Sequence, residues 1–223
     1  MTKDAKINRD ASRSWFKRFG YQFIRIGLWF GFKLCFFYRS RGARNFPKNG
    51  PALICVNHQS HLDPMLAGVP SRRRMNFLAK KQLFAKPPLS WLVHFLDSIP
   101  IDREGMSAGG IKETLKRLKR GEMVLMFPEG TRSPDGTLQP ILPGFVALVR
   151  RVKAPIIPVG IDGAQRAWPK GKKIFRPFRR ISVVIGEPIP HEDLEERSDE
   201  EILQILESRL RDVVNESIQW NQS

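Results

Sequence analysis

The sequence predicts an α/β fold, a mixed sheet flanked by helices, because three observations agree. Short apolar segments rich in β-branched residues alternate with segments whose apolar residues recur at helical spacing. The chain has 223 residues, which is enough for one α/β domain with a buried core. Its 41% hydrophobic and 27% charged residues are typical of a folded protein without low-complexity segments.

The first predicted element is an amphipathic helix from Ser14 to Tyr38, which follows a polar N-terminal tail. Its apolar residues recur at steps of three and four along one stripe: Phe16, Phe19, Phe23, Ile26, Phe30, Leu34 and Phe37. The opposite side carries the basic residues Lys17, Arg18, Arg25 and Lys33. Such a helix is typical of a membrane interface, and the alternative is an ordinary helix packed on the domain core.

The longest uncharged run in this helix, Ile26 to Phe32, is far shorter than the roughly 20 residues that span a bilayer. Phe32, Cys35 and Phe36 interrupt the polar side of its second half. We expect this half either to insert more deeply or to be covered by protein. The sequence therefore divides into a basic, membrane-binding segment over residues 1–44 and an α/β domain over residues 45–223.

Strands and helices alternate through the predicted α/β domain. Strands are predicted over 52–56, 76–80, 98–101, 122–127, 156–161 and 181–185. Helices are predicted over 64–69, 89–96, 107–120, 144–151 and from Ser198 onward, where Ser198 and Glu201 form a capping box. The acidic last helix is expected to cover the sheet.

A polar segment, Asn57 to Asp63, follows the first strand of this domain. Asp63 fits the N-cap of the next helix and Pro64 its first position, so His58 lies in a loop at a strand end. Ligands bind at this edge of open α/β sheets. If the loop turns back, the Asp63 carboxylate can fix the tautomer of His58 and raise its basicity.

Two further polar segments, 102–103 and 128–132, also follow predicted strands, and such strand ends can converge on one cleft. The candidate phosphate ligands are Lys80, Arg103 and Arg132, since guanidinium groups bind phosphate through two hydrogen bonds. The backbone of Gly130 and Thr131 could add N–H donors. This set suits removal of a proton from a hydroxyl beside a bound phosphate.

Other chemistries have weaker support in the sequence. No Ser or Cys lies in a nucleophile-elbow context, so we expect Ser60 to shape the loop and Cys55 to be a core residue. No Cys/His cluster has zinc-like spacing, and no metal is expected. The two cysteines, Cys35 and Cys55, show no pairing pattern that indicates a disulfide framework.

The net charge of +16 indicates an anionic partner, although the last 33 residues hold 10 Asp or Glu and only 3 Lys or Arg. Nucleic acid, anionic lipid and a phosphorylated cofactor all satisfy this charge. We expect no nucleic acid, because no helix-turn-helix, zinc or RNA-binding signature is present.

Five segments, in order, resemble the motifs of the glycerolipid acyltransferase family, whose type member acts on 1-acylglycerol 3-phosphate. They are Asn57-His58-x-Ser60-x-x-Asp63, Ala79 to Phe84, Ile99 to Arg103, Phe127 to Ser133 and Ile156 to Ile161. The resemblance covers roughly residues 45–190, which implies that residues 45–223 form an acyltransferase catalytic domain. Gln82 replaces an acid that is often found in the second segment, and Pro100 stands where a bulky apolar residue is common.

The resemblance implies transfer of a fatty acyl group from acyl-CoA or acyl carrier protein to the free sn-2 hydroxyl of 1-acylglycerol 3-phosphate, which gives phosphatidic acid. His58 would be the general base and Asp63 would orient it. The acceptor phosphate would be bound by Lys80, Arg103, Glu129, Gly130, Thr131 and Arg132. Pro158 would lie on the acyl-donor side. Because a carboxylate is a poor phosphate ligand, we expect Glu129 to hold a cation or the loop in place.

The resemblance implies direct attack on the thioester, without an acyl-enzyme, which agrees with the absence of a nucleophile motif. No cofactor is expected, because acyl-CoA or acyl carrier protein serves as a substrate. The expected partners are an anionic membrane surface, the lysophospholipid and the acyl carrier, with the protein on the cytoplasmic face of a membrane. Two alternatives remain open: an acyltransferase for another lysophospholipid or glycerol 3-phosphate, and a non-catalytic membrane-binding scaffold.

Overall fold

The computed structural model describes residues 15–85, 87, 90, 93, 98–101, 108–172, 174 and 176–223. For residues 15–18, 80, 81, 83, 100 and 101 it describes the backbone alone. The helix predicted over 89–96 therefore lies almost entirely outside the described residues.

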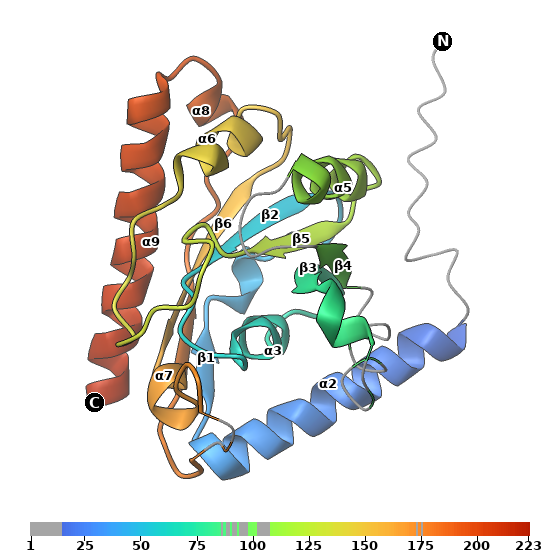
Figure 1. The fold of residues 1–223 in the computed structure, drawn as a ribbon, viewed down its shortest axis with the longest axis vertical. Helices are drawn as coiled ribbons and strands as arrows, with labels where there is room; N and C mark the ends of the chain where they lie inside the picture. Colours follow the sequence, from blue (N-terminus) through green and yellow to red (C-terminus); the bar gives the residue numbers. More distant parts are fainter. Residues whose placement is uncertain are drawn as a thin grey trace.

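Seven strands of the described chain form one sheet (Figure 1). They are β1 (Arg39–Arg41), β2 (Ala52–Val56), β3 (Met75–Lys80), β4 (Ile99–Ile101), β5 (Met123–Met126), β6 (Ile156–Asp162) and β7 (Ser182–Ile185). Their spatial order is β1-β7-β6-β2-β5-β3-β4. Only β6 and β7 pair antiparallel among these neighbours, so the predicted mixed sheet is confirmed.

Helices cover both faces of the sheet. One hydrophobic cluster joins the sheet to α2 (Trp15–Phe36), α3 (Asp63–Gly68) and α7 (Ala164–Ala167). A second cluster, on the opposite face, includes residues of α5 (Ala108–Lys119), α6 (Pro143–Val149), α8 (Glu192–Glu195) and α9 (Asp199–Gln222). Short 3-10 turns lie at Ala43–Asn45 and Lys81–Phe84.

The central strand β2 explains how one apolar run serves both faces. Ala52, Ile54 and Val56 belong to the first cluster, while Leu53 and Cys55 belong to the second. Successive side chains of a strand point to opposite faces, so a strand that is covered on both sides is apolar at every position. All five residues are buried.

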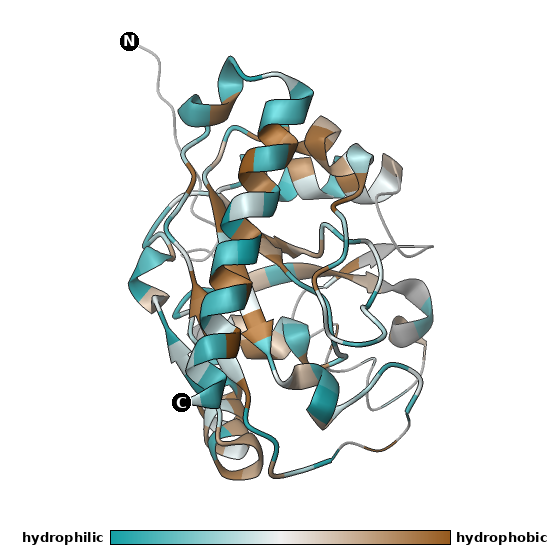
Figure 2. Ribbon diagram, turned by 90° about the vertical axis from the view of Figure 1, so that its left-hand side faces the viewer, coloured by the Kyte–Doolittle hydropathy of each residue, from teal (hydrophilic) through white to brown (hydrophobic). Residues whose placement is uncertain are grey.

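Helix α9 begins with the predicted capping box. The Ser198 hydroxyl accepts a hydrogen bond from the Glu201 amide at 3.2 Å, and the Glu201 carboxylate accepts one from the Ser198 amide at 2.7 Å. Its buried side packs on β6 and β7, and hydrophilic residues line its outward side (Figure 2). The expectation that the acidic last helix covers the sheet is confirmed.

Helix α2 docks on the domain through its polar side. The Arg25 guanidinium donates to the Val69 carbonyl at 3.0 Å, and the Gln22 amide donates to the Arg72 carbonyl at 2.8 Å. Phe32 and Phe36 are buried, so protein covers this part of the second half.

The apolar stripe of α2 instead faces outward. Its described members are all exposed: Phe19, Phe23, Ile26, Phe30, Leu34 and Phe37. The stripe is therefore not packed on the domain core. Among the described helices, none has the length and apolar character needed to cross a membrane.

Strand β1 was not predicted, because Arg39-Ser40-Arg41 has neither apolar nor β-branched residues. It pairs parallel with β7, with Arg39 opposite Ser182. The sheet therefore includes residues from both sides of the expected division at residue 44.

Gly160 of β6 lies where α9 approaches the sheet most closely. A Cβ atom at this position would lie 2.3 Å from the Val213 carbonyl oxygen of α9, which is backbone and cannot rotate away. We expect Gly160→Ala to lower the free energy of unfolding by about 1–3 kcal/mol, as overpacking of a core does. Urea unfolding followed by circular dichroism measures this change.

Gly109→Ala is the matched control. Nothing lies within 4 Å of a Cβ at Gly109, which is exposed in α5, so alanine should stabilise the helix by about 0.5–1 kcal/mol. An unchanged unfolding midpoint for Gly160→Ala would contradict the close packing of α9 on β6.

Candidate active site

The loops after β2 and β5 meet at one edge of the sheet. Both strands run parallel, so their carboxyl ends lie at the same edge. The Ser133 amide donates to the His58 carbonyl at 2.7 Å, which ties the two loops together. The Asn57 side chain ties the first loop to β6: its amide donates to the Ile161 carbonyl at 2.9 Å, and its oxygen accepts from the Ile161 amide at 2.8 Å.

Asp63 is the centre of the first loop. Its Oδ2 atom lies 2.8 Å from His58 Nδ1 and accepts hydrogen bonds from the amides of Gln59 (2.6 Å) and Ser60 (2.7 Å). The side chain of Asp63 is fully buried. The prediction of Asp63 as the N-cap is wrong: Leu62 occupies the cap position, and the Asp63 carboxylate points back to the loop.

His58 is held on two sides. Asp63 accepts from Nδ1, so the neutral ring carries its hydrogen on that nitrogen and has its lone pair on Nε2. The Phe127 ring stacks on the imidazole with a centroid distance of 3.7 Å and an interplanar angle of 12°. The side chain of His58 keeps 18% exposure. The second nitrogen, which forms no hydrogen bond to any described residue, can therefore take up a proton.

Glu129 holds the two loops together. Oε1 accepts from the His58 amide at 2.6 Å, and Oε2 accepts from the Gln139 amide at 2.9 Å. Burial raises the pKa of Glu129 to about 7, and the nearby Asp63 carboxylate adds to the rise, although the two amide hydrogen bonds oppose it. Both carboxylate oxygens are thus engaged by backbone, as expected of a residue that holds the loop in place.

Gly130, Thr131 and Arg132 follow in the β5 loop. Gly130 adopts φ +70° and its N–H donates to the Phe127 carbonyl at 3.0 Å, so the expectation that this N–H is free for phosphate is wrong. Thr131 is exposed. The Nη1 atom of Arg132 is buried and has no hydrogen-bond partner among the described residues. A buried guanidinium nitrogen without a partner is costly, which suits a site for an anion.

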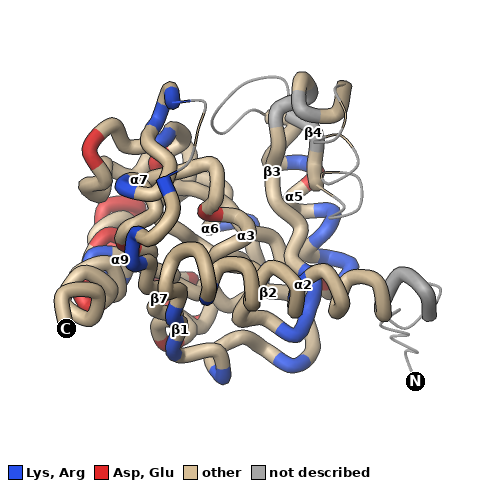
Figure 3. The backbone as a smooth tube through the Cα atoms, turned by 90° about the horizontal axis from the view of Figure 1, so that it is seen from below, with Lys and Arg blue, Asp and Glu red and all other residues tan. Residues whose placement is uncertain are grey.

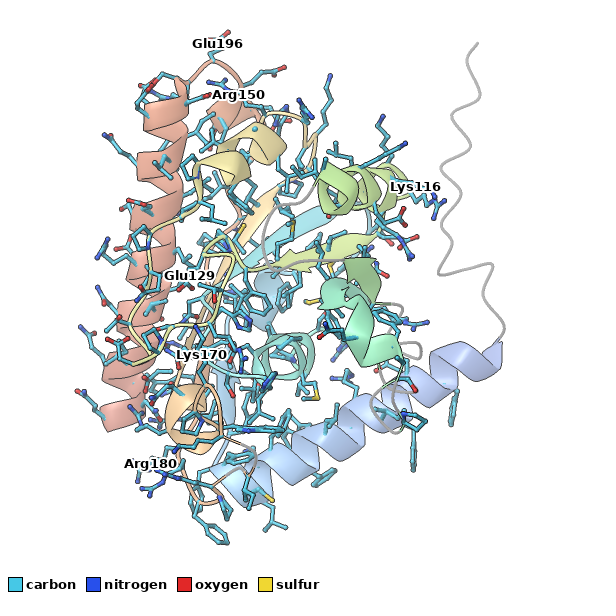
Figure 4. All side chains as sticks on the ribbon, viewed as in Figure 1. Lys116, Glu129, Arg150, Lys170, Arg180 and Glu196 are labelled. Atoms are coloured by element: carbon cyan, nitrogen blue, oxygen red, sulfur yellow. The ribbon has the colours of Figure 1, made fainter. Side chains whose placement is uncertain are left out.

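Lys170 is a cation at this site that sequence reasoning missed. Its Nζ donates to the Arg132 carbonyl at 2.8 Å and lies 3.4 Å from the Thr131 hydroxyl. Glu129 and Lys170 both lie between α9 and α3 in Figure 4. Lys170 belongs to a Pro-Lys-Gly turn 38 residues after Arg132, and no local pattern connects the two.

Asn57 and Phe127 lie in segments that resemble family motifs, but the sequence indicated neither the pairing of Asn57 with β6 nor the stacking of Phe127 on His58. Gln139 lies outside every motif segment.

Three predicted site residues are not seen beside the His58 and Arg132 loops. Arg103 lies outside the described residues, and of Lys80 only the backbone, at the end of β3, is described. Pro158 lies inside β6, opposite Cys55 of β2, and its ring lies beside Gly186.

Ser60 and Cys55 contribute to the loop and to the core, respectively, as expected. The Ser60 hydroxyl donates to the Trp168 carbonyl at 3.0 Å and accepts from the Leu62 amide at 3.3 Å, so it shapes the loop. Cys55 is buried in the sheet, and burial raises the pKa of its thiol far above its usual value. The described part of the chain contains no group of three or more His, Cys, Asp or Glu that could hold a metal ion.

The arrangement can remove a proton from a hydroxyl. The buried Asp63 carboxylate stabilises a protonated His58 ring, and the ring keeps one nitrogen available. Arg132, in the neighbouring β5 loop, and Lys170, in the turn after α7, supply positive charge.

Comparisons with known proteins agree with this chemistry. A family model described as Acyltransferase matches residues 38–162. The 1-acyl-sn-glycerol-3-phosphate acyltransferase of Bacillus subtilis is 30% identical over 176 residues, which are 77% of this chain and 83% of that protein. A chloroplastic 1-acyl-sn-glycerol-3-phosphate acyltransferase of Brassica napus is 28% identical over 73% of this chain, which spans only 48% of that protein.

A solved structure is also similar. The crystal structure of the 1-acyl-sn-glycerophosphate (LPA) acyltransferase PlsC from Thermotoga maritima superposes with a TM-score of 0.68 and 28% identity, over 79% of this chain and 70% of that chain. The family model covers more than half of this chain and includes the loops that carry His58, Asp63 and Glu129. The chain belongs to the acyltransferase family.

Proposed function

We propose that the protein transfers a fatty acyl group from acyl-CoA or acyl carrier protein to the sn-2 hydroxyl of 1-acylglycerol 3-phosphate, forming phosphatidic acid. The observation that carries this proposal is the buried Asp63 carboxylate bound to His58 Nδ1 beside a cationic loop. The names of the similar proteins support the choice of acceptor. A non-catalytic scaffold would have no use for a carboxylate–imidazole pair with a free nitrogen.

The reaction follows from the geometry of this pair. His58 Nε2 takes the proton of the acceptor hydroxyl while the hydroxyl oxygen attacks the carbonyl carbon of the thioester. The tetrahedral intermediate then collapses, the C–S bond breaks, and the leaving thiolate takes the proton from the imidazolium. Asp63 stabilises the imidazolium between these steps through the 2.8 Å contact with Nδ1. No covalent acyl-enzyme forms.

The acceptor phosphate would bind next to the β5 loop. Arg132 brings a buried nitrogen without a partner, and Lys170 brings an ammonium group within 3.4 Å of the Thr131 hydroxyl. Lys80 and Arg103 join this group on the resemblance of their motifs alone. Glu129 acts as a brace of the loop rather than a ligand, because both its oxygens accept from backbone amides.

The acyl donor would lie on the side of Pro158, a position that rests on the resemblance alone. The exposed stripe of α2 supports an interfacial position of this helix, with the catalytic domain on the cytoplasmic face of an anionic membrane. There it would meet both the lysophospholipid in the membrane and the acyl carrier in solution.

His58→Ala tests the proposed base. A positioned general base contributes roughly 10²–10⁴-fold, so this variant should lose at least about 10²-fold in turnover with lysophosphatidate and either thioester donor. Thiol release measures the rate, and circular dichroism checks the fold. His191→Ala, at the start of α8, is the control. Turnover close to that of the wild type would exclude His58 as the base.

Lys170→Ala tests the added phosphate ligand. A charge-assisted hydrogen bond contributes about 1.5–3 kcal/mol, so the KM for lysophosphatidate should rise roughly tenfold or more with little change in the KM for the donor. Lys172→Ala is the matched control, because Lys172 is an exposed lysine two residues away. Equal KM values for both variants would argue against a role of Lys170 in acceptor binding.

Glu129→Gln tests the raised pKa of the buried Glu129 carboxyl. Its pKa is about 7 in the folded protein and about 4.5 in the unfolded chain, so the folded state binds more protons between these values. The free energy of unfolding should therefore fall as pH rises from 4.5 to 7, by up to about 3 kcal/mol.

Urea unfolding at pH 4.5, 6, 7 and 8 measures this slope. Glutamine does not titrate, so the unfolding free energy of Glu129→Gln should lack this part of the pH dependence. At low pH the variant should be less stable than the wild type, because glutamine has one acceptor oxygen rather than two. Parallel curves for the two proteins would contradict the raised pKa.

A further inference from the structure

The exposed apolar stripe of α2 continues onto another part of the chain. Phe37, directly after the helix, is 55% exposed, and Phe178 in the segment between α7 and β7 is 68% exposed. Their ring centroids lie 6.4 Å apart. Figure 1 shows this segment beside the C-terminal end of α2. Two elements that are 141 residues apart in sequence thus form one apolar surface.

Both phenylalanines have an unusual backbone. Phe37 has φ +45° and Phe178 has φ +60°, and they are the only described residues other than glycine with positive φ. Bulky side chains rarely adopt this region because it is strained. Hydrogen bonds fix the conformation: the Phe178 amide donates to the Cys35 carbonyl at 2.6 Å, and the Ile181 amide donates to the Phe36 carbonyl at 3.1 Å. The fold thus tolerates strain at two positions where large apolar rings are exposed.

Positive charge surrounds these rings. Residues 163–186 contain seven Lys or Arg and no Asp or Glu. Arg176, Arg179 and Arg180 are exposed, and none of them forms an ion pair with a described residue. Figure 3 shows Lys and Arg positions near α7, β1 and α2, while acidic positions concentrate on α9. Apolar rings bordered by unpaired arginines complement an anionic lipid surface, which offers an apolar interior below a negative headgroup layer.

We propose that residues 176–180 form a second membrane contact, in which Phe178 inserts beside Phe37 while Arg176, Arg179 and Arg180 bind anionic lipid headgroups. This rests on the proposed interfacial position of α2. A single helix that lies in the interface can rotate about its own axis. A second contact at its C-terminal end removes this freedom and sets which side of the domain faces the membrane.

The same segment is bound to the candidate active site. The Arg176 amide donates to the Ala167 carbonyl of α7 at 2.6 Å. The carbonyl of the next residue, Trp168, accepts a hydrogen bond from the Ser60 hydroxyl in the His58 loop. Lys170 donates a hydrogen bond to the Arg132 carbonyl. Docking of residues 176–180 therefore places the site at a fixed height above the headgroups, where a lysophospholipid can reach it without leaving the bilayer completely.

Binding of the full chain to vesicles tests the proposal. Vesicles of phosphatidylcholine alone and with about 30% phosphatidylglycerol distinguish apolar insertion from headgroup binding. Phe178→Asn removes the ring but keeps the backbone, because asparagine tolerates positive φ. We expect roughly tenfold weaker binding to both vesicle types, since burial of one aromatic ring is lost.

The second variant replaces Arg176, Arg179 and Arg180 together by glutamine. Its binding should fall at least about tenfold on anionic vesicles, with no change on neutral ones, and the difference should vanish in 1 M salt. The matched control replaces Arg197, Arg209 and Arg211, on and before α9, by glutamine and should bind as the wild type does.

Activity separates this proposal from the proposed function. All variants should keep wild-type turnover with a short-chain, water-soluble lysophosphatidate and lose it in proportion to binding when the acceptor is embedded in vesicles. If the wild type lacks activity in both assays, the proposed function fails, while the vesicle measurements still decide this inference. Wild-type vesicle binding by both variants would overturn it. So would a wild-type dimer in sedimentation equilibrium that Phe178→Asn dissociates, because the surface would then join two copies of the chain.

Discussion

The buried carboxylate of Asp63 is the constraint on which the candidate site depends. An anion that is removed from water must be compensated by hydrogen bonds, and Oδ2 receives three, from the His58 ring and from the amides of Gln59 and Ser60. These donors come from consecutive residues, so the loop can compensate Oδ2 only by wrapping around it. Oδ1 is buried without a hydrogen-bond partner among the described residues. The orientation of the imidazole is thus a result of charge compensation inside the loop.

The two strands beside β2, which are β6 and β5, both support this loop. Asn57 bonds to the backbone of β6, and Glu129 and Ser133 bond from the β5 loop to the two backbone groups of His58. The strand order β6-β2-β5 is therefore part of the site, because it brings both supports beside the strand that carries the histidine. The stacked Phe127 ring, which follows β5, completes the same pattern.

The sequence predicted the elements with strong periodicity and failed where distant residues decide. Strand β2 was predicted over its full length because an apolar run between turn residues has few alternatives. The capping box of α9 is a local pattern and was also correct. The strand of Arg39 to Arg41 was missed, since only its pairing with β7 makes it a strand. The role of Lys170 was also missed, because it depends on a contact across 38 residues. The outward direction of the α2 stripe agrees with the membrane-interface interpretation of its helical pattern.

The attachment of α2 has a mechanical consequence. The Arg25 side chain of α2 donates to the Val69 carbonyl, directly after α3. The Tyr38 hydroxyl, two residues after α2, donates to the Leu66 carbonyl of α3 at 2.9 Å. Helix α3 is six residues long, about 9 Å, and its first residue is Asp63. A force that lifts α2 is therefore transmitted through one short rigid rod to the carboxylate that aligns the histidine. The surface helix and the His58–Asp63 pair are therefore mechanically coupled through α3.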